Sequence, residues 1–161
     1  MHRIRQFVRH LTARVRPDEA ALAHRILPIS AIALFDGMPV ADRRHGLDVT
    51  QRLMSRGLAD PDLLIAGLLH DAAKGHRTRL VHRVAGVLLA AGAPRLLARI
   101  ANPDVRSWRH GFHLYLHHGP MSADAALAAG CTPRAASFIR GTAAGADGPL
   151  ARALRDADEA S

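Results

Sequence analysis

A histidine and an aspartate stand side by side in the most apolar stretch of the chain, at His70 and Asp71. The residues from Leu63 to Leu69 carry no polar side chain, and the pattern predicts a helix to about Ala73 that is buried nearly all round. An unpaired carboxylate is costly in such a place, and a buried imidazole also needs a partner. The partner could be an arginine in an ion-pair network or a divalent metal ion.

Two further residues could complete a metal site with this pair. His45 lies early in a predicted amphipathic helix, residues 41–56. Asp158 lies near the end of the last predicted helix, where the helix dipole disfavours an acid, although many acids there are simply solvated. Two imidazoles and two carboxylates form a mixed nitrogen–oxygen set. Such a set suits manganese, iron, cobalt, nickel or magnesium better than structural zinc.

Three segments carry a resemblance to a known family. They are Arg44–Val49 (RHGLDV), Leu68–Gly75 (LLHDAAKG) and the late Ala157–Asp158. Together they resemble the HD-domain metal-dependent phosphohydrolase superfamily, whose pattern is a first histidine, an adjacent His-Asp pair on a later buried helix, and a final aspartate. The resemblance covers about residues 35 to 161, and its specific part is the octapeptide around the His-Asp pair.

The resemblance implies a role for each matching residue. It makes His45, His70, Asp71 and Asp158 the metal ligands, with one divalent ion per site. It also makes Asp71 and Lys74 the catalytic residues, because a lysine three residues after the aspartate contacts substrate phosphate in many members. The spacing supports this role independently, since residues three apart on a helix share a face.

A second metal site is less complete. His118 matches a position where some members place an extra ligand or a substrate contact, and His117 is the adjacent competitor. The remaining extra histidine would follow an Ile-Arg pair similar to Ile139–Arg140, but Gly141 stands there. This departure favours a single metal and leaves open a site with weak activity or none.

Other polar residues receive more ordinary interpretations. His110 and His113 share a helical face with His117 and are expected to line a surface, and His82 is expected to be a core histidine with a satisfied ring. Asp48 could orient His45 or be exposed. The arginines near the site in sequence, Arg43, Arg44, Arg77 and Arg79, could grip further phosphates.

Composition limits the fold and the partners. The chain has 161 residues, of which 48% are hydrophobic and only 4% aromatic, so that helices are favoured over strands. Its single cysteine, Cys131, excludes an internal disulfide. The formal net charge of +8 favours anionic partners such as phosphorylated metabolites or nucleic acid. No segment predicts a secretion signal or a membrane span, so we expect a cytoplasmic protein.

Glycine and proline positions divide the chain into helices. We predict an all-α, HD-domain-like fold, a compact bundle of about seven to nine helices, with residues 1–34 packed on or extending a metal-binding domain of residues 35–161. Residues 1–16 combine an apolar stripe with five arginines, which predicts a helix docked on the domain or lying on acidic lipid. The later helices are predicted at 17–27, 29–35, 41–56, 61–73, 77–91, 95–100, 107–118, 121–129, 133–140 and 149–160.

These patterns lead to two functional hypotheses of different classes. The first is a metal-dependent phosphohydrolase that acts on a small phosphoester or a nucleotide. The alternative is a catalytically weak or inactive HD-type module that binds a ligand or nucleic acid. A third, minor hypothesis is a di-iron oxygenase, which the incomplete second set of histidines disfavours.

Overall fold

Helices are the only regular secondary structure among the described residues, which are 13–75, 78 and 80–161 of a computed structural model. The prediction of an all-α bundle with seven to nine helices is confirmed for this part of the chain. In chain order the helices are α2 (Pro17–Ile26), α3 (Ile29–Asp36), α4 (Val40–Ser55), α5 (Pro61–Leu69), α6 (Leu80–Gly92), α7 (Pro94–Ile100), α8 (His110–Ala128), α9 (Pro133–Arg140), a 3-10 turn (Gly145–Asp147) and α10 (Gly148–Glu159).

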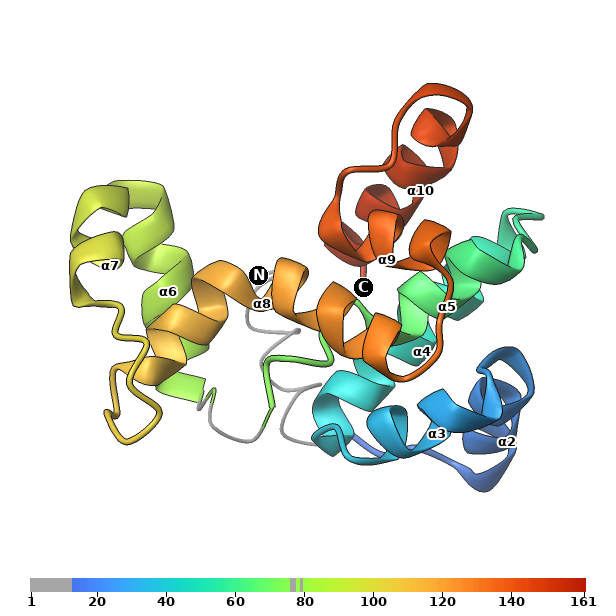
Figure 1. Ribbon diagram of the computed structural model, residues 1–161, viewed down its shortest axis with the longest axis horizontal. Helices are drawn as coiled ribbons and strands as arrows, with labels where there is room; N and C mark the ends of the chain where they lie inside the picture. The colour runs from blue at the N-terminus through green and yellow to red at the C-terminus, as the bar shows by residue number, and fades with distance from the viewer. Residues whose placement is uncertain (1–12, 76–77, 79) are drawn as a thin grey trace.

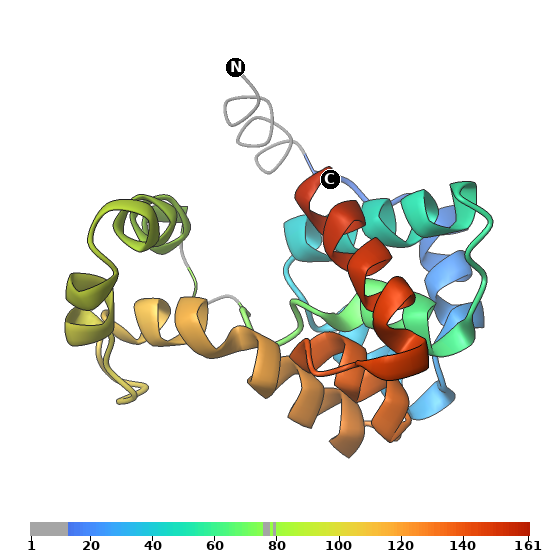
Figure 2. The same cartoon turned by 90° about the horizontal axis from the view of Figure 1, so that it is seen from above.

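The bundle has a body and an arm, joined along the long helix α8 (Figures 1 and 2). The body consists of residues 13–75 and 119–161, which include α2 to α5, α9, α10 and the second half of α8. The arm consists of residues 80–118, in which α6 and α7 pack on each other and on the first half of α8. The predicted helix of residues 1–16 lies almost wholly outside the described residues.

Helix α5 forms the centre of the body. Every residue from Leu63 to Leu69 is buried, as the sequence predicts, and the helix packs against α2, α4, α8, α9 and α10. Two glycines let α4 and α5 approach closely. A Cβ on Gly46 would lie 2.7 Å from the Leu68 carbonyl oxygen, and one on Gly67 would lie 2.7 Å from Thr50 Oγ1. This contact brings the residue before Gly46, which is His45, next to the end of α5.

Several predicted helix boundaries are wrong, among them the start of α8, which is at His110 and not at Ser107. Helix α5 ends at Leu69, not near Ala73, because the chain continues in tight turns. One of these turns is closed by a hydrogen bond that the Lys74 amide donates to the Asp71 carbonyl oxygen. The segments predicted as separate helices at 107–118 and 121–129 are one helix, α8, with Pro120 inside it. A proline removes one helical hydrogen bond and can bend a helix, but the close packing of α8 on α9 keeps its second half helical.

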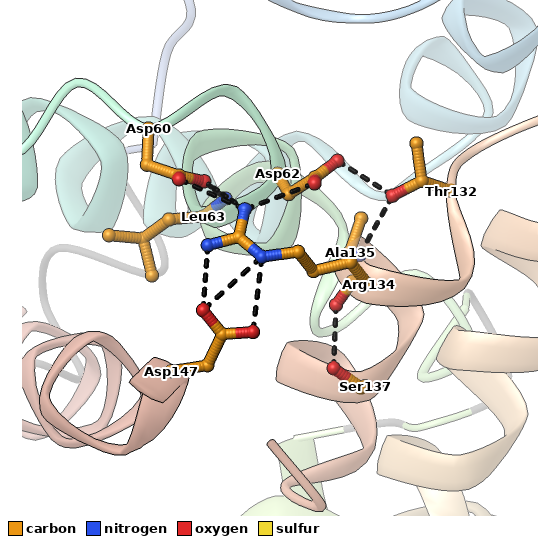
Figure 3. A network of polar contacts seen from close by, with 8 residues as sticks. All are labelled: Asp60, Asp62, Leu63, Thr132, Arg134, Ala135, Ser137 and Asp147. Atoms are coloured by element: carbon orange, nitrogen blue, oxygen red, sulfur yellow. Dashed lines mark hydrogen bonds and ion pairs between the residues drawn. The ribbon is translucent and has the colours of Figure 1, made fainter. Parts of the chain in front are cut away.

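An arginine at the start of α9 connects three separate segments of the body (Figure 3). Arg134 Nη1 lies 2.8 Å from Asp60 Oδ1 and 3.1 Å from Asp62 Oδ2, and Nη2 lies 2.8 Å from Asp147 Oδ1. Asp60 also caps α5 by accepting a hydrogen bond from the Leu63 amide. The Arg134 guanidinium holds the pKa of Asp60 below its usual value. The cluster therefore fixes the start of α5 against α9 and the 3-10 turn.

The variant Arg134→Met is expected to have a thermal midpoint at pH 7 that is roughly 3–6 °C below that of the wild type. Exposed ion pairs contribute up to about 1 kcal/mol each, and about 1 kcal/mol moves the midpoint of such a domain by about 2–4 °C. A carboxylate whose pKa is depressed by folding stabilises the folded state above its unfolded pKa, and this contribution is lost as pH falls. The difference between variant and wild type should therefore shrink below about pH 4. Circular-dichroism melts at pH 7 and pH 3 measure the difference in midpoint between variant and wild type, with Arg140→Met as the control. A difference that is equal at both pH values would contradict the expectation.

Candidate metal centre

Three of the predicted ligands come together from three helices. His45 on α4, His70 at the end of α5 and Asp158 on α10 each offer an atom within 4.8 Å of the other two. The Asp158 Oδ1 atom lies 2.7 Å from His45 Nε2 and 3.4 Å from His70 Nε2. Residues that are up to 113 positions apart in the sequence thus meet at one point, as the motif predicts.

The ring of His70 is oriented by the backbone of its own helix. Its Nδ1 atom lies 3.0 Å from the Gly67 carbonyl oxygen, and an N–H there can donate to that acceptor. In the neutral ring, the opposite nitrogen, Nε2, then carries the lone pair. This arrangement, in which one ring nitrogen bonds a carbonyl and the other points into a site, is typical of metal-binding histidines.

Two buried atoms at this point make no hydrogen bond to any of the described residues. They are His70 Nε2 and Asp71 Oδ1, which lie 3.7 Å apart. Buried polar atoms are nearly always paired, so two orphans facing each other need an explanation. A divalent cation would satisfy both atoms at once, and imidazole nitrogen with carboxylate oxygen is a donor set that suits such ions. The residues present therefore fit the metal that the motif implies.

The partner of Asp71 is a lysine and not an arginine. Lys74 Nζ lies 2.6 Å from Asp71 Oδ2, while Asp71 Oδ1 faces His70. The carboxylate is almost fully buried, and the Lys74 side chain retains 19% exposure. The ion pair thus uses one oxygen of Asp71 and leaves the other one for a further ligand.

The charges of the cluster depend on one another. Burial lowers the pKa of His70, but the nearby Asp71 charge and the contact with Asp158 raise it to about 9. Although burial opposes it, Lys74 and His70 hold the pKa of Asp71 well below its usual range, and His45 and His70 do the same for Asp158. Without a cation, a proton on His70 balances the two carboxylates. A metal ion and this proton would therefore compete for the same nitrogen.

His118, and not His117, adjoins the cluster. His118 Nε2 lies 3.6 Å from Asp71 Oδ1, and its Nδ1 atom lies 2.8 Å from the Tyr115 carbonyl oxygen. Burial and the Lys74 charge lower the pKa of His118, which favours the neutral ring that a metal or a phosphate contact can use. His117 is exposed and its ring lies against His113.

The cluster has a closed side and an open side. Asp71 is buried and the His70 side chain is 12% exposed, whereas the side chains of His45, His118 and Asp158 are more exposed, Asp158 most of all at 47%. A ligand would therefore approach from the side of Asp158 and His118 and meet the buried pair last.

Two other candidates near the site, Arg44 and Asp48, pair with each other. Arg44 lies against Glu19 and Asp48, which leaves its charge already compensated and disfavours a role in gripping phosphate. Asp48 therefore pairs with Arg44, 2.9 Å away, and not with His45. Arg77 and Arg79 lie outside the described residues. His82 is a buried histidine whose Nε2 lies 2.8 Å from the Trp108 carbonyl oxygen, as expected of a core residue.

Three positioning residues were missed by the sequence analysis. Gly46 allows the approach of α4 to α5, and a glycine inside a helix is a signal that could have indicated it. Ser122 on α8 is fully buried and accepts a hydrogen bond from the Ala73 amide, which holds the turn after Asp71. Arg52 donates to the Ala160 carbonyl oxygen and so holds the end of α10 near Asp158. Nothing in the sequence around Ser122 or Arg52 indicated these contacts.

No family model, no curated protein and no solved structure matches this chain. Membership of the HD-domain superfamily therefore stays a prediction from the three motif segments. The function is inferred below from the geometry of the site itself.

Proposed function

We propose that this protein is a metal-dependent phosphohydrolase that acts on a small phosphoester or a nucleotide. The observation that carries the proposal is the pair of buried atoms without hydrogen bonds, His70 Nε2 and Asp71 Oδ1, beside the contact between His45 and Asp158. A divalent cation would satisfy both atoms at once, whereas the protein groups around them lie at longer distances: His70 Nε2 is 3.4 Å from Asp158 Oδ1, and Asp71 Oδ1 is 3.6 Å from His118 Nε2.

The ligands in this proposal are His45, His70, Asp71 and Asp158, and the ion is manganese, iron, cobalt, nickel or magnesium. When bound, such an ion polarises a phosphoryl oxygen and lowers the pKa of water, which provides hydroxide near neutral pH. These four residues would hold the ion and would leave space beside it for water and a phosphate group.

The surrounding residues bind and orient the phosphate. Lys74 lies beside Asp71 and is not fully buried, so its ammonium group can turn from the carboxylate toward a phosphate oxygen and neutralise charge there. The His118 Nε2 atom lies 3.6 Å from Asp71 Oδ1 and can donate a hydrogen bond or accept a proton. The side chains of both residues are partly exposed.

The binding-module alternative has its own supporting observation. Gly141 stands where a second-site histidine would be expected, and the chain has a formal charge of +8. Nucleic-acid binding through phosphates would weaken steeply with salt and would persist in His70→Ala, whereas phosphohydrolysis would not survive that change.

The direct test is a metal analysis of the purified protein together with a phosphate-release screen. The screen uses p-nitrophenyl phosphate and nucleoside mono-, di- and triphosphates, each with the five candidate ions and with chelator. We expect one bound divalent ion per chain and an activity that falls at least about 100-fold in His70→Ala, because such a change removes a metal ligand. His24→Ala, which alters a histidine paired with Asp36 away from the site, is the matched control. A protein that binds none of the ions, or a His70→Ala variant as active as wild type, would refute the proposal.

A further inference from the structure

The arm exposes an unusual number of large apolar side chains. Trp108 is 67% exposed, Leu88 62% and Val81 55%. In the arm, the large apolar side chains that are exposed are Val81, Val84, Val87, Leu88, Leu96, Val105, Trp108 and Leu116. In the described body they are Ile29, Val40, Met54 and Leu127. A concentration of exposed apolar side chains of this kind is typical of an interaction site.

Helix α6 carries exposed apolar side chains on the face that is turned away from α8. One face packs on α8, where the buried ring of His82 lies against Gly111 and Gly86 lies against the ring of Tyr115. The opposite face carries Val81, Val84 and Leu88, which the helical period places together. Every exposed residue of α6 whose side chain is described is apolar. A helix at a protein surface normally has a polar outer face, so this face is expected to have a partner.

The charge of the arm indicates the chemistry of that partner. Residues 80–118 contain five arginines (Arg83, Arg95, Arg99, Arg106 and Arg109) and a single acid, Asp104. The segments 17–79 and 119–161 together contain 12 basic and 13 acidic residues, so they are nearly neutral. The net positive charge therefore lies on the arm and on residues 1–16, which have five arginines and no acid.

We propose that the arm docks the protein on an anionic lipid bilayer, with its exposed apolar side chains at the level of the acyl chains and its arginines at the phosphates. Apolar side chains bordered by arginine, with tryptophan at the boundary, are the combination that binds such a surface. A second copy of the chain would bring two positive arms together, and residues 1–12 would bring further arginines to a positive surface. Both are disfavoured as occupants of the α6 face.

The loop between α7 and α8 adds a place for a headgroup. A hollow of about 440 Å³ is lined by Leu96, Arg99, Ile100, Trp108 and Arg109, so that two guanidinium groups adjoin an exposed indole. Arg109 is held by a hydrogen bond from its Nε atom to the Ile100 carbonyl oxygen, whereas Arg99 is exposed. None of the helices in the described part of the chain has the length and apolarity needed to span a bilayer, so docking on the surface is the mode that fits.

Trp108 makes the inference testable, because it is the only tryptophan of the chain. Mixing the full-length protein with vesicles of phosphatidylcholine and phosphatidylglycerol should shift the indole emission to the blue and carry the protein with the vesicles in a flotation assay. Vesicles of phosphatidylcholine alone should do neither. Added salt should weaken the binding, since the arginines contribute through charge. This inference does not depend on the proposed phosphohydrolase activity.

Leu88→Glu is the decisive variant and Ile29→Glu its matched control, because Ile29 is an exposed apolar residue of the body. We expect Leu88→Glu to reduce vesicle binding by at least about tenfold, since an ionised glutamate cannot enter the apolar layer without a large cost, and Ile29→Glu to leave it unchanged. Circular dichroism would show that both variants fold. No binding to vesicles of any composition, or equal binding by both variants, would overturn the inference. So would a dimer in light scattering without lipid that Leu88→Glu dissociates, because a second copy would then cover the face.

Discussion

Asp71→Asn is expected to remove the stabilisation that manganese gives to the wild-type protein. The change keeps the size of the side chain but removes the negative charge that would balance the cation beside His70. A ligand at about 100 times its dissociation constant stabilises a protein by about 2.7 kcal/mol, which corresponds to roughly 5–10 °C in the midpoint of such a domain. We expect this shift in the wild type and almost none in the variant, with phosphatase activity lost as well.

With chelator present, the same variant should melt close to the wild type. Removing the buried carboxylate takes away a desolvation cost, and Lys74 can turn its ammonium group to water because its side chain is partly exposed. Thermal melts of both proteins with manganese and with chelator measure these differences. Asp156→Asn, at an exposed acid on the same helix as Asp158, is the control. A wild-type midpoint that no divalent ion moves, with a large loss in Asp71→Asn under all conditions, would contradict the metal site.

In melts with manganese and with chelator, Lys74→Met is expected to behave in the opposite way to Asp71→Asn. Removing the lysine strands the Asp71 carboxylate in the core, and breaking one side of a buried ion pair costs about 3–5 kcal/mol. With chelator, the midpoint should therefore fall by roughly 6–20 °C. Manganese should restore most of this loss, because the cation would neutralise the carboxylate that the lysine had neutralised before. The metal-dependent shift should then exceed that of the wild type.

The same variant should lose activity although it binds metal. Because Lys74 is proposed to neutralise the substrate phosphate, we expect kcat to fall by at least about 100-fold, as is typical when one charge-stabilising donor is removed. Lys74→Arg, which keeps the positive charge, should melt like the wild type with chelator. If Lys74→Met melts like the wild type without metal, the ion pair with Asp71 does not stabilise the fold. If the kcat of Lys74→Met is unchanged, Lys74 does not act on the substrate.

The sequence predicts the helices well where local signals decide them. Helix α9 begins at Pro133 after its capping residue Thr132 and ends at Arg140 before Gly141, as the caps indicate. The prediction from the sequence fails at Pro120, because packing against another helix decides whether a helix continues through a proline. Here the other helix is α9. The prediction fails again after Leu69, where the turn is held by Ser122, a residue 49 positions away from its partner Ala73.

The motif segments name the members of the proposed site but say nothing of how those members pair with one another. The structure brings atoms of His45, His70 and Asp158 within 4.8 Å of one another, and Asp71 Oδ1 lies 3.7 Å from His70 Nε2. The spacing of Lys74 indicates a shared face with Asp71, but not an ion pair that forms in a turn outside the helix. Arg44 shows the reverse case, since its place beside His45 in the sequence says nothing about Glu19, which compensates it from α2.

The separation of His45 from Asp158 along the chain also bears on how the protein folds. The contact between them closes a loop of 113 positions, and the entropy cost of closing a loop rises with its length. Short-range contacts within the helices can form early, whereas this contact requires α10 to have docked on α4. A cation held across the contact would act as a reversible cross-link that slows unfolding more than it speeds folding. We therefore expect the metal to lower the unfolding rates in a chevron plot and to change the folding rates little.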